Sequence, residues 1–567
     1  MTINVLLRSD DSNGFDKRLK LAPMMLLASA CFLSACGSAG ATDAASAMKS
    51  SKANVNSNGG GPTTPTPTPT TTSTSTSSTT VTYDTSVGNG VDANGFASLP
   101  LRSGAHRYFV SSAKGSDANS CAAAQVSNTP KATIASALSC VANGNGDQVL
   151  VSEGTTYSEP MSGLNGKSGF SALYPTVIQT YDPADPLNDT KYGRGDQRGA
   201  RPVMKGDGEP IGGGSGAVSY VAIRGFDFNP GNVNDRAVSL LPNGTANAAF
   251  VLIENNLFRY TTFSADMISA SSQSDHLILR NNSIYGTWSV NDKAGQGIYF
   301  DGWQNATIED NVIYHAGWKI GASRDDGVAN GGPSMFKHSI YEQSTNAGPC
   351  ITRRNLIADG SADGGQYRSN STVSENVYID NPISVSAGGG SNYYLYQPTG
   401  VNLEVSYNAI LGDADLNSSN PRGVAIEASN GRLGSSVHHN LIARSRNVNG
   451  VNNWAFVTAA DFNQPSYMGW DHNVVYQWTT ALQIYLPGGA YPSQDFPTYT
   501  NNIWDAASSG TNTNIAGGTY PNPYTATQLY AALGFPDKQT FINYAIEHPE
   551  AHIQRQARTL LFAGYGM

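Results

Sequence analysis

The sequence predicts an all-β fold in which the chain winds as a single-stranded parallel β-helix. The first observation is an asparagine that recurs in one local frame, at steps of 26, 29, 44, 21, 32, 32, 33 and 29 residues. Self-similarity at a period of about 20–50 residues is typical of solenoids, propellers and arrays. The nine positions are Asn256, Asn282, Asn311, Asn355, Asn376, Asn408, Asn440, Asn473 and Asn502.

The second observation is the length and type of the apolar runs beside each asparagine. Ile308 precedes Asn311, and Val312 and Ile313 follow it, in a form that the other frames share. Such short runs of Val, Ile, Leu and Tyr suit strands and not helices. A leucine-rich repeat would add a helix to each period, and a propeller blade needs about four strands in roughly 40–50 residues. We therefore expect two or three strands per coil, with coils stacked about 4.8 Å apart.

The recurring asparagine suits a corner of such a coil. Asn tolerates the left-handed backbone conformation, and its side-chain amide can bond the equivalent amide one coil away. We expect a ladder of amides parallel to the coil axis. A structural role outweighs a catalytic one, so none of the nine is placed in the active site.

Composition agrees with a turn-rich extracellular β protein. Gly makes up 60 of the 567 residues and charged residues are 14 %, against about 25 % in typical soluble domains. The net charge of −9 is mild and no basic run is present, so we expect no nucleic-acid partner. An acidic substrate stays open, because a local basic cleft would decide its binding. We expect a monomer.

The N-terminal segment indicates export. Residues 17–36 combine a basic start, an apolar stretch and small residues before a cysteine, which predicts a signal peptide over 1–36. The motif LSAC resembles the bacterial lipobox, which implies that Cys36 is lipidated; Gly37 in place of Asp is similar to lipoproteins of the outer membrane. The apolar run is too short to span a membrane, so we expect attachment to the bacterial cell envelope through lipid only, on either face of the outer membrane. An ordinary cleaved signal peptide is the alternative.

Composition divides the rest of the chain into three parts. Residues 37–103 begin with a Ser/Thr/Pro-rich stretch that cannot form a core, which predicts a disordered tether. We expect the β-helix domain at 104–520, with folding beginning near Tyr108. Residues 521–567 have helical spacing of Leu, Ala, Ile and Phe. They predict a small helical segment that caps the last coil.

The start of the β-helix domain carries a family resemblance. RYFVSSAKGSD (107–117) is a strand followed by a Gly-Ser-Asp turn, and TIASALSC (133–140) is helix-like. This layout resembles the N-terminal cap of the pectate-lyase-like right-handed parallel β-helix superfamily, and the resemblance spans about residues 107–515. It implies right-handed coils and a capping helix over the open core, and it assigns no single activity.

The five cysteines include one candidate pair. Cys121 and Cys140 flank the helix-like stretch, and a disulfide between them is expected in an oxidising compartment. Cys350 precedes an Ile-Thr strand and is expected to be a small buried apolar residue.

Four segments align as one sheet and bring polar side chains to its outer face: GIYFDG (297–302), HSIYEQ (338–343), GGQYRSN (364–370) and PISVSAGGG (382–390). Strand alternation predicts a first outward column of Tyr299, Tyr341, Gln366 and Ser384. It predicts a second outward column of Asp301, Gln343, Arg368 and Ser386.

The surroundings of these columns favour a site. Lys337 and His338 stand at the entry to the second strand, whereas Glu342 falls on the inward side. The long step from Asn311 to Asn355 contains an insertion, 317–337, that ends at the cluster. Long loops on a rigid scaffold carry function more often than the scaffold does. We expect a shallow groove here, of the kind seen in many β-helix proteins active on polysaccharides, which the HxIY and GxQxR segments resemble.

These residue types suit β-elimination on a uronate polymer, which needs a cation for the carboxylate, a base for the C5 proton and an acid for the leaving oxygen. Arg368 is the candidate carboxylate clamp, and His338, Tyr341 and Lys337 are the candidate base and acid. The expected substrate-binding residues are Tyr299, Asp301, Gln343 and Gln366. Asp325 and Asp326, with Asp301, are candidate ligands for Ca²⁺.

A lyase acting on an acidic extracellular polysaccharide is the first hypothesis. Hydrolysis needs two carboxylates about 5–9.5 Å apart, for which Asp301 and one of Asp325 and Asp326 are available. A non-catalytic carbohydrate-binding or adhesive rod is the second hypothesis, and a scaffold protein of polysaccharide export is a weaker third. Signatures of polygalacturonases (GHG with paired Asp), mannuronan epimerases (DPHD) and family-1 pectate lyases (vWIDH, RxPxxR) are missing.

Overall fold

The computed structural model of the chain describes residues 81–159, 164, 166–194, 201–205, 218–229, 236–239, 248–260, 262–265, 274–290, 295–388, 400–429, 431–432, 434–445, 453–459, 469–478, 480–485, 499–500, 502–504, 516–517 and 520–567. The predicted signal peptide, its lipidation site Cys36 and the tether up to residue 80 lie outside the described residues.

Within the described residues, the strands form three sheets, of 13, 13 and 9 strands, and every pairing between these strands is parallel. The first sheet contains β1 (Arg107–Val110), β2 (Gln148–Ser152), β4 (Thr176–Tyr181), β6 (Ser219–Arg224), β9 (Ala249–Glu254), β12 (Asp275–Arg280), β15 (Ala306–Glu309), β18 (Cys350–Arg353), β21 (Ser371–Ser374), β24 (Leu403–Ser406), β27 (Ser436–His438), β30 (Gly469–Asp471) and β33 (Tyr499–Thr500). The second contains β3 (Thr156–Tyr157), β5 (Val203–Met204), β7 (Asp227–Phe228), β10 (Leu257–Arg259), β13 (Ser283–Tyr285), β16 (Val312–Tyr314), β19 (Leu356–Ala358), β22 (Val377–Ile379), β25 (Ala409–Leu411), β28 (Leu441–Ala443), β31 (Val474–Tyr476), β34 (Ile503–Trp504) and β35 (Ala516–Gly517). The third contains β8 (Arg236–Ser239), β11 (Thr262–Ala265), β14 (Ile298–Phe300), β17 (His338–Glu342), β20 (Asp363–Tyr367), β23 (Ile383–Ala387), β26 (Gly423–Ser429), β29 (Asn453–Ala459) and β32 (Thr480–Tyr485).

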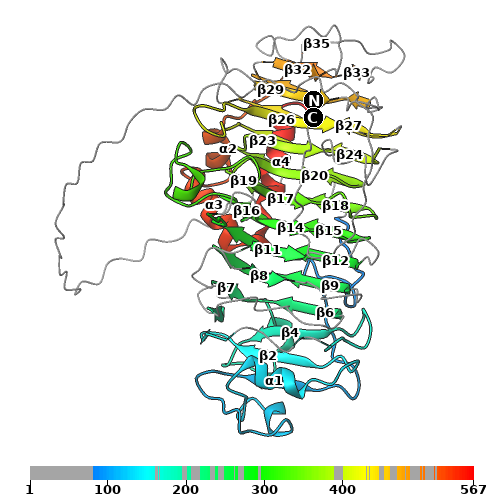
Figure 1. The fold of residues 1–567 in the computed structure, drawn as a ribbon, viewed down its shortest axis with the longest axis vertical. Coiled ribbons are helices and arrows are strands. Elements are labelled where there is room, and N and C mark those ends of the chain that lie inside the picture. Colours follow the sequence, from blue (N-terminus) through cyan, green and yellow to red (C-terminus); the bar gives the residue numbers. More distant parts are fainter. Residues whose placement is uncertain are drawn as a thin grey trace, which may run out of the picture. The chain divides into compact units, whose positions relative to one another are not determined.

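The chain passes through the sheets in a repeating order. β12, β13 and β14 belong to the first, second and third sheets, and β15 returns to the first beside β12. Figure 1 shows the strands of successive coils stacked on one another. This mostly-β architecture with parallel sheets is consistent with the predicted parallel β-helix, and the handedness of its coils stays a prediction.

The recurring asparagines form the expected ladder of amides. Asn355 shows the pattern: its backbone N–H and its Nδ2 both donate to Oδ1 of Asn376, each at 2.9 Å. The same Nδ2 donates to the carbonyl of Ile308 at 2.9 Å, and its Oδ1 accepts from the backbone of Asn311 at 2.9 Å. Equivalent bonds join all nine asparagines. Each side chain is at most 1 % exposed, so the ladder satisfies buried polar groups that have no access to water.

The left-handed residue at each corner is the one before the ladder asparagine. The expectation that the ladder asparagine itself adopts this conformation is wrong. The side chain of the ladder asparagine is buried and bonds the neighbouring coils, and the residue before it makes the turn. That earlier residue has a φ between 52° and 59° at eight corners: Asn255, Asn281, Asp310, Arg354, Glu375, Tyr407, His439 and His472.

The interior is one continuous apolar core along the stacked coils. Its largest side chains include Trp303, Trp470 and Trp478, all fully buried. α1 (Ile134–Cys140) begins after Thr133, whose side chain accepts from the amide of Ser136 at 3.1 Å. This helix adds three apolar side chains to the core beside β1, and its role as a cap stays a prediction. The short 3₁₀ helices are η1 (Ala123–Gln125), η2 (Asp189–Lys191), η4 (Val328–Asn330) and η6 (Pro549–Ala551).

The cysteines take the places that the sequence suggested. Cys121 and Cys140 form a disulfide with their Cα atoms 5.5 Å apart. Cys350 is a buried free thiol at the start of β18.

Packed structure begins earlier than the predicted boundary at residue 104. Val87, Ala97 and Leu99 are buried against the outer side of the first sheet, on residues that include Val177 and Ala222. Residues 81–103 therefore cover part of the first sheet.

The C-terminal helices lie along the second sheet and not on the last coil, which corrects the predicted cap. They are α2 (Ala526–Ala532), α3 (Lys538–Glu547) and α4 (Ile553–Gly564). α3 contacts β13 and β16, and α4 contacts β22 and β25, as Figure 1 shows at the side of the coils. The outer face of the second sheet carries apolar residues such as Leu356 and Val377 that need this cover. No helix in the described residues is long and apolar enough to cross a membrane.

We predict that Asn355→Ala lowers the free energy of unfolding by roughly 2–4 kcal/mol, because it leaves the buried carbonyl of Ile308 and the amide of Asn311 without partners. The control is Asn370→Ala, which removes one acceptor for the amide of Asn402 at an exposed position; it should cost less than about 1 kcal/mol. Chemical denaturation measures both. Equal losses would contradict a special role for the ladder.

Candidate functional site

The register of the third sheet defines a column of outward side chains across five coils. Tyr299 is paired with Tyr341, Tyr341 with Gln366, Gln366 with Ser386, and Ser386 with Glu427. We call these five residues the outer column. The first three match the predicted column.

The fourth position of the predicted column was wrong. Ser386, and not Ser384, follows Gln366, and Ser384 is only 1 % exposed. The same shift removes Ser386 from the second predicted column. Ser386 is paired with Gln366 and Ala387 with Tyr367, so the position beside Arg368 comes after Ala387.

A bend in the third sheet explains the shift. Ala425 and Ile426 are adjacent in sequence, yet both lie fully buried in the main core. Strict alternation forbids this, so the strand bends between them, and the residue before the bend turns away from the core. Accordingly Val424 packs with Ile383 and Trp454 in an apolar cluster separate from the main core.

His338 and Asp363 precede the same bend in neighbouring coils. They are paired with each other, and Asp363 is paired with Ile383. The Nδ1 atom of His338 lies 3.1 Å from Oδ2 of Asp363, and both side chains are almost fully buried. The imidazole ring lies edge-on to Tyr341, with ring centroids 4.9 Å apart. An imidazole backed by a carboxylate thus lies directly beside the outer column.

Tyr341 is the centre of the contacts on this face. Nη1 of Arg368 donates to its hydroxyl at 2.7 Å, and the guanidinium lies 5.0 Å from the ring centroid. Its ring packs edge-on against Tyr299 at 5.3 Å, and the hydroxyl of Tyr299 contacts Asp301 at 3.5 Å. The structure therefore brings together the predicted residues His338, Tyr341, Arg368, Tyr299 and Asp301.

Arg368 has no carboxylate partner among the described residues. Its Nε atom is buried and has no hydrogen-bond partner in that part of the chain. Oε1 of the neighbouring Gln366 is likewise buried and without a partner there. By contrast, Arg353 and Arg280 each bond Glu309. A half-buried guanidinium with spare donors on an outer face is a candidate binding group for an anion.

Lys337 and Gln343 are placed less favourably for chemistry. Lys337 is fully buried, and its Nζ donates to the carbonyl of Ser289 at 2.6 Å. The side chain of Gln343 is half-buried and accepts from the amide of Ser344 at 3.2 Å. Lys337 therefore holds the end of the 317–337 insertion, and Gln343 stays a candidate contact for substrate.

The predicted calcium ligands do not gather in the described residues. Asp325 accepts from the amide of Ser418 at 2.7 Å, and Asp326 accepts from the amide of Ser323 at 2.8 Å. In the described part of the chain, the one group of three or more acidic, His or Cys side chains spaced to hold a metal lies elsewhere and contains neither of them, nor Asp301. Here the two aspartates organise the insertion and join it to the segment around residue 418.

Glu427 is a candidate site residue that the sequence reasoning missed. It is half-buried at the end of the outer column. Burial raises the pKa of its carboxyl to about 7, Asp363 adds to the rise, and Arg422 opposes it. The alternation in GVAIEAS (423–429) is the signal that would have found it, had that strand been added to the four aligned segments.

Glu342 lies on the opposite face of the sheet from the outer column. It is fully buried, and its Oε1 accepts from the amide of Ser369 at 3.1 Å and from the hydroxyls of Ser369 and Ser371. Burial raises the pKa of its carboxyl to about 7, against the effect of these hydrogen bonds. The inward position expected from the sequence is thus real. Oε1 is bonded, whereas Oε2 is buried without a hydrogen-bond partner among the described residues.

Comparisons with known proteins give weak likenesses. No protein-family model and no curated protein matches the chain. Among solved structures, a rhamnogalacturonan lyase is 14 % identical with a TM-score of 0.28, over 65 % of this chain and 84 % of that one. An alginate lyase from Paenibacillus sp. str. FPU-7 is 13 % identical with a TM-score of 0.29, over 67 % and 96 %. GH136 lacto-N-biosidase from Eubacterium ramulus is 14 % identical with a TM-score of 0.29, over 70 % and 68 %. At these TM-scores the likenesses assign no activity.

We predict that Glu342→Gln stabilises the protein only at high pH. The pKa of Glu342 is raised in the folded state. Its contribution to the free energy of unfolding is therefore fully present below its ordinary pKa of 4.5 and is lost as the pH rises through about 7. The variant imitates the protonated acid. Its free energy of unfolding should equal that of the parent near the ordinary pKa of 4.5 and exceed it above pH 7, by roughly 1–3 kcal/mol. Denaturation curves at the two pH values measure this.

The control for that experiment is Glu547→Gln, at an exposed position of α3. It should change the stability little at either pH. A Glu342→Gln variant that is destabilised equally at both pH values would show that the folded protein holds the ionised carboxylate.

Proposed function

We propose that the chain is an extracellular enzyme that cleaves an acidic polysaccharide by β-elimination on the outer face of the third sheet. The observation that carries this proposal is Arg368. It presents a guanidinium without a carboxylate partner among the described residues, and it bonds the hydroxyl of Tyr341 at 2.7 Å. A cation for the substrate carboxylate and a phenol for proton transfer are thereby held side by side.

Each residue then has a role in the reaction. Arg368 binds the uronate carboxylate and neutralises the charge that develops when the C5 proton leaves. The oxygen of Tyr341, ionised beside the Arg368 guanidinium, takes that proton; the C5–H electron pair forms the C4=C5 double bond, and the C4–O bond breaks with its electron pair going to the leaving oxygen. Tyr341 then gives the proton to that oxygen, which restores its starting form. His338, backed by Asp363 and packed against the ring of Tyr341, positions the phenol.

Neighbouring residues would bind the polymer. Tyr299 and Gln366 continue the outer column on both sides of Tyr341, and Asp301 and Gln343 stay candidate contacts. Trp454, half-buried beside Val424, offers an aromatic surface to a sugar ring. The predicted signal peptide and lipidation at Cys36 agree with a substrate outside the cell, and both belong to this proposal.

We predict that the full chain produces unsaturated uronate ends from a uronate polymer and that Tyr341→Phe and Arg368→Ala each reduce the rate about 100-fold or more. Tyr341→Phe keeps the ring and its packing, so it removes only the hydroxyl. Ultraviolet absorbance of the unsaturated product measures the rate on polygalacturonate and on alginate. Arg107→Ala, which removes a surface guanidinium paired with Asp189 at 3.4 Å, is the control and should keep parental activity.

Two other outcomes separate the rival functions. Binding of a polymer in affinity electrophoresis with no product from the parent protein would support a carbohydrate-binding rod. Release of reducing ends without unsaturated product would support a hydrolase.

One observation favours hydrolysis as the second candidate function. Glu427 has a pKa of about 7, because of burial first and then of Asp363, so it is partly protonated at neutral pH. A carboxylic acid that is partly protonated at neutral pH and influenced by a second carboxylate could serve as the general acid of glycoside hydrolysis.

For a hydrolase, we predict that activity falls as the pH rises through about 7, because the proton that Glu427 must donate is lost. Glu427→Gln should abolish reducing-end release, whereas Glu547→Gln on α3 should not change it. If the Glu427→Gln variant is active and its activity still falls as the pH rises through about 7, Glu427 is not the acid.

A further inference from the structure

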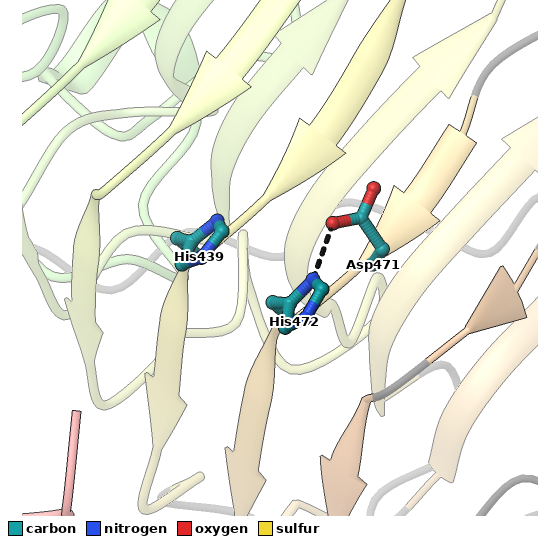
Figure 2. Close-up of side chains that lie close together, drawn as sticks. All are labelled: His439, Asp471 and His472. Atoms are coloured by element: carbon teal, nitrogen blue, oxygen red, sulfur yellow. Dashed lines mark hydrogen bonds and ion pairs between the residues drawn. The ribbon is translucent and has the colours of Figure 1, made fainter.

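A cluster of imidazoles lies at the corner between the first and second sheets, away from the third. His439 follows the end of β27, and His472 follows the end of β30, in the neighbouring coil. Both occupy the left-handed corner position, with φ of 53° and 52°. Figure 2 shows the two rings stacked, with Asp471 beside His472.

The geometry of the cluster suits a shared ligand. The rings of His439 and His472 are 4.9 Å apart and nearly parallel, at 8°. One nitrogen from each ring and one oxygen of Asp471 all lie within 4.8 Å of one another. Tyr407 stacks on the other side of His439, at 4.9 Å and 21°, and limits the movement of that ring.

Polar contacts hold the three side chains in place. Nδ1 of His472 lies 2.7 Å from Oδ1 of Asp471, so a ring nitrogen and a carboxylate oxygen are already adjacent. His439 and His438 share a bond between their Nδ1 atoms at 2.9 Å, which leaves Nε2 of His439 for a ligand. Nε2 of His438 lies 3.7 Å from Oε1 of Glu404.

Two carboxylates, Asp471 and Glu404, lie at the same corner as the imidazoles. Their negative charge reduces the repulsion that a divalent cation would meet.

We propose that His439, His472 and Asp471 bind a divalent transition metal such as Zn²⁺, which links two neighbouring coils. Two imidazoles and one carboxylate suit Zn²⁺, Cu²⁺ or Ni²⁺, whereas Ca²⁺ prefers ligands that are all oxygen. Metal–nitrogen bonds are about 2.0–2.1 Å long, so the side chains close on the ion by rotation. His472 is exposed, which leaves room for that rotation. Water completes the coordination, as in an open site.

The site is independent of the proposed polysaccharide chemistry. It joins β27 to β30 and bridges two corners 33 residues apart in sequence. A metal bound there would stabilise the folded form because the unfolded chain does not hold these residues together. The expected effect is therefore on stability, with no effect on the reaction at Tyr341.

The test is competition for Zn²⁺ between the full chain, produced without an affinity tag, and a chromophoric chelator. We expect saturable binding of one Zn²⁺, a rise in the thermal midpoint with Zn²⁺, and no response to Ca²⁺. His472→Ala should weaken binding about tenfold or more, and His439→Ala should do the same. His472 is exposed, so its variant should fold as the parent does.

The matched control is His276→Ala. His276 has the same local features: a left-handed φ of 55°, a contact of 2.8 Å from its Nδ1 to Asp275, and a ring stacked on an aromatic neighbour, Phe250. That neighbour is not a histidine, so the variant should bind Zn²⁺ as the parent does. Absence of saturable binding, or equal binding by the parent, His439→Ala and His472→Ala, would overturn the proposal.

Discussion

The amide ladder is the constraint on which the rest of the structure depends. Each ladder asparagine uses its whole amide group: Oδ1 accepts the backbone N–H of one neighbouring coil, and Nδ2 donates to the other. A buried amide that missed these partners would carry the full cost of its desolvation. Every coil must therefore return to the same corner, whatever its length. The step from Asn311 to Asn355 is 44 residues and the next is 21, so the additional chain must leave the stack as a loop.

This constraint accounts for the position of the candidate site. The 317–337 insertion belongs to the longest step between ladder asparagines, and its last residue, Lys337, is anchored by the carbonyl of Ser289. β17 begins directly after it with His338. The outer column thus lies where the third sheet meets this irregular segment. The same register places Tyr299, Tyr341 and Gln366 in contact although the chain between them is long.

A buried ion network fastens both ends of the described chain to the coils. Arg354 bonds Glu309 at 2.8 Å and Asp310 at 3.2 Å, and Arg555 of α4 bonds Asp310 at 2.6 Å. The hydroxyl of Tyr83 accepts from Arg555 at 2.8 Å. Burial alone would raise the pKa of Asp310, but Arg354 and Arg555 hold it below its ordinary value. The N-terminal segment and the last helix therefore meet at one corner.

Much of the fold could be predicted because a period of polar corners and short apolar runs survives in the sequence. The register of Tyr299, Tyr341 and Gln366 followed from alternation alone. Ser386 could not, because Ser384 and Val385 before it are both buried, which gives β23 a second inward residue that alternation does not anticipate. The place of the C-terminal helices also escaped prediction. Leu356 and Val377 look like core residues in the sequence, although they face the helices.

The two perturbed glutamates show why burial by itself does not identify a functional group. Glu342 and Glu427 both have a pKa of about 7, and burial is the largest cause for each. The carboxyl of Glu342 is enclosed on the inner side of the sheet and bonded to Ser369 and Ser371, so it does not face the outer column. Glu427 ends a column of partly exposed side chains and is influenced by Asp363. A shifted pKa becomes a functional signal only when the group also faces outward among other polar residues.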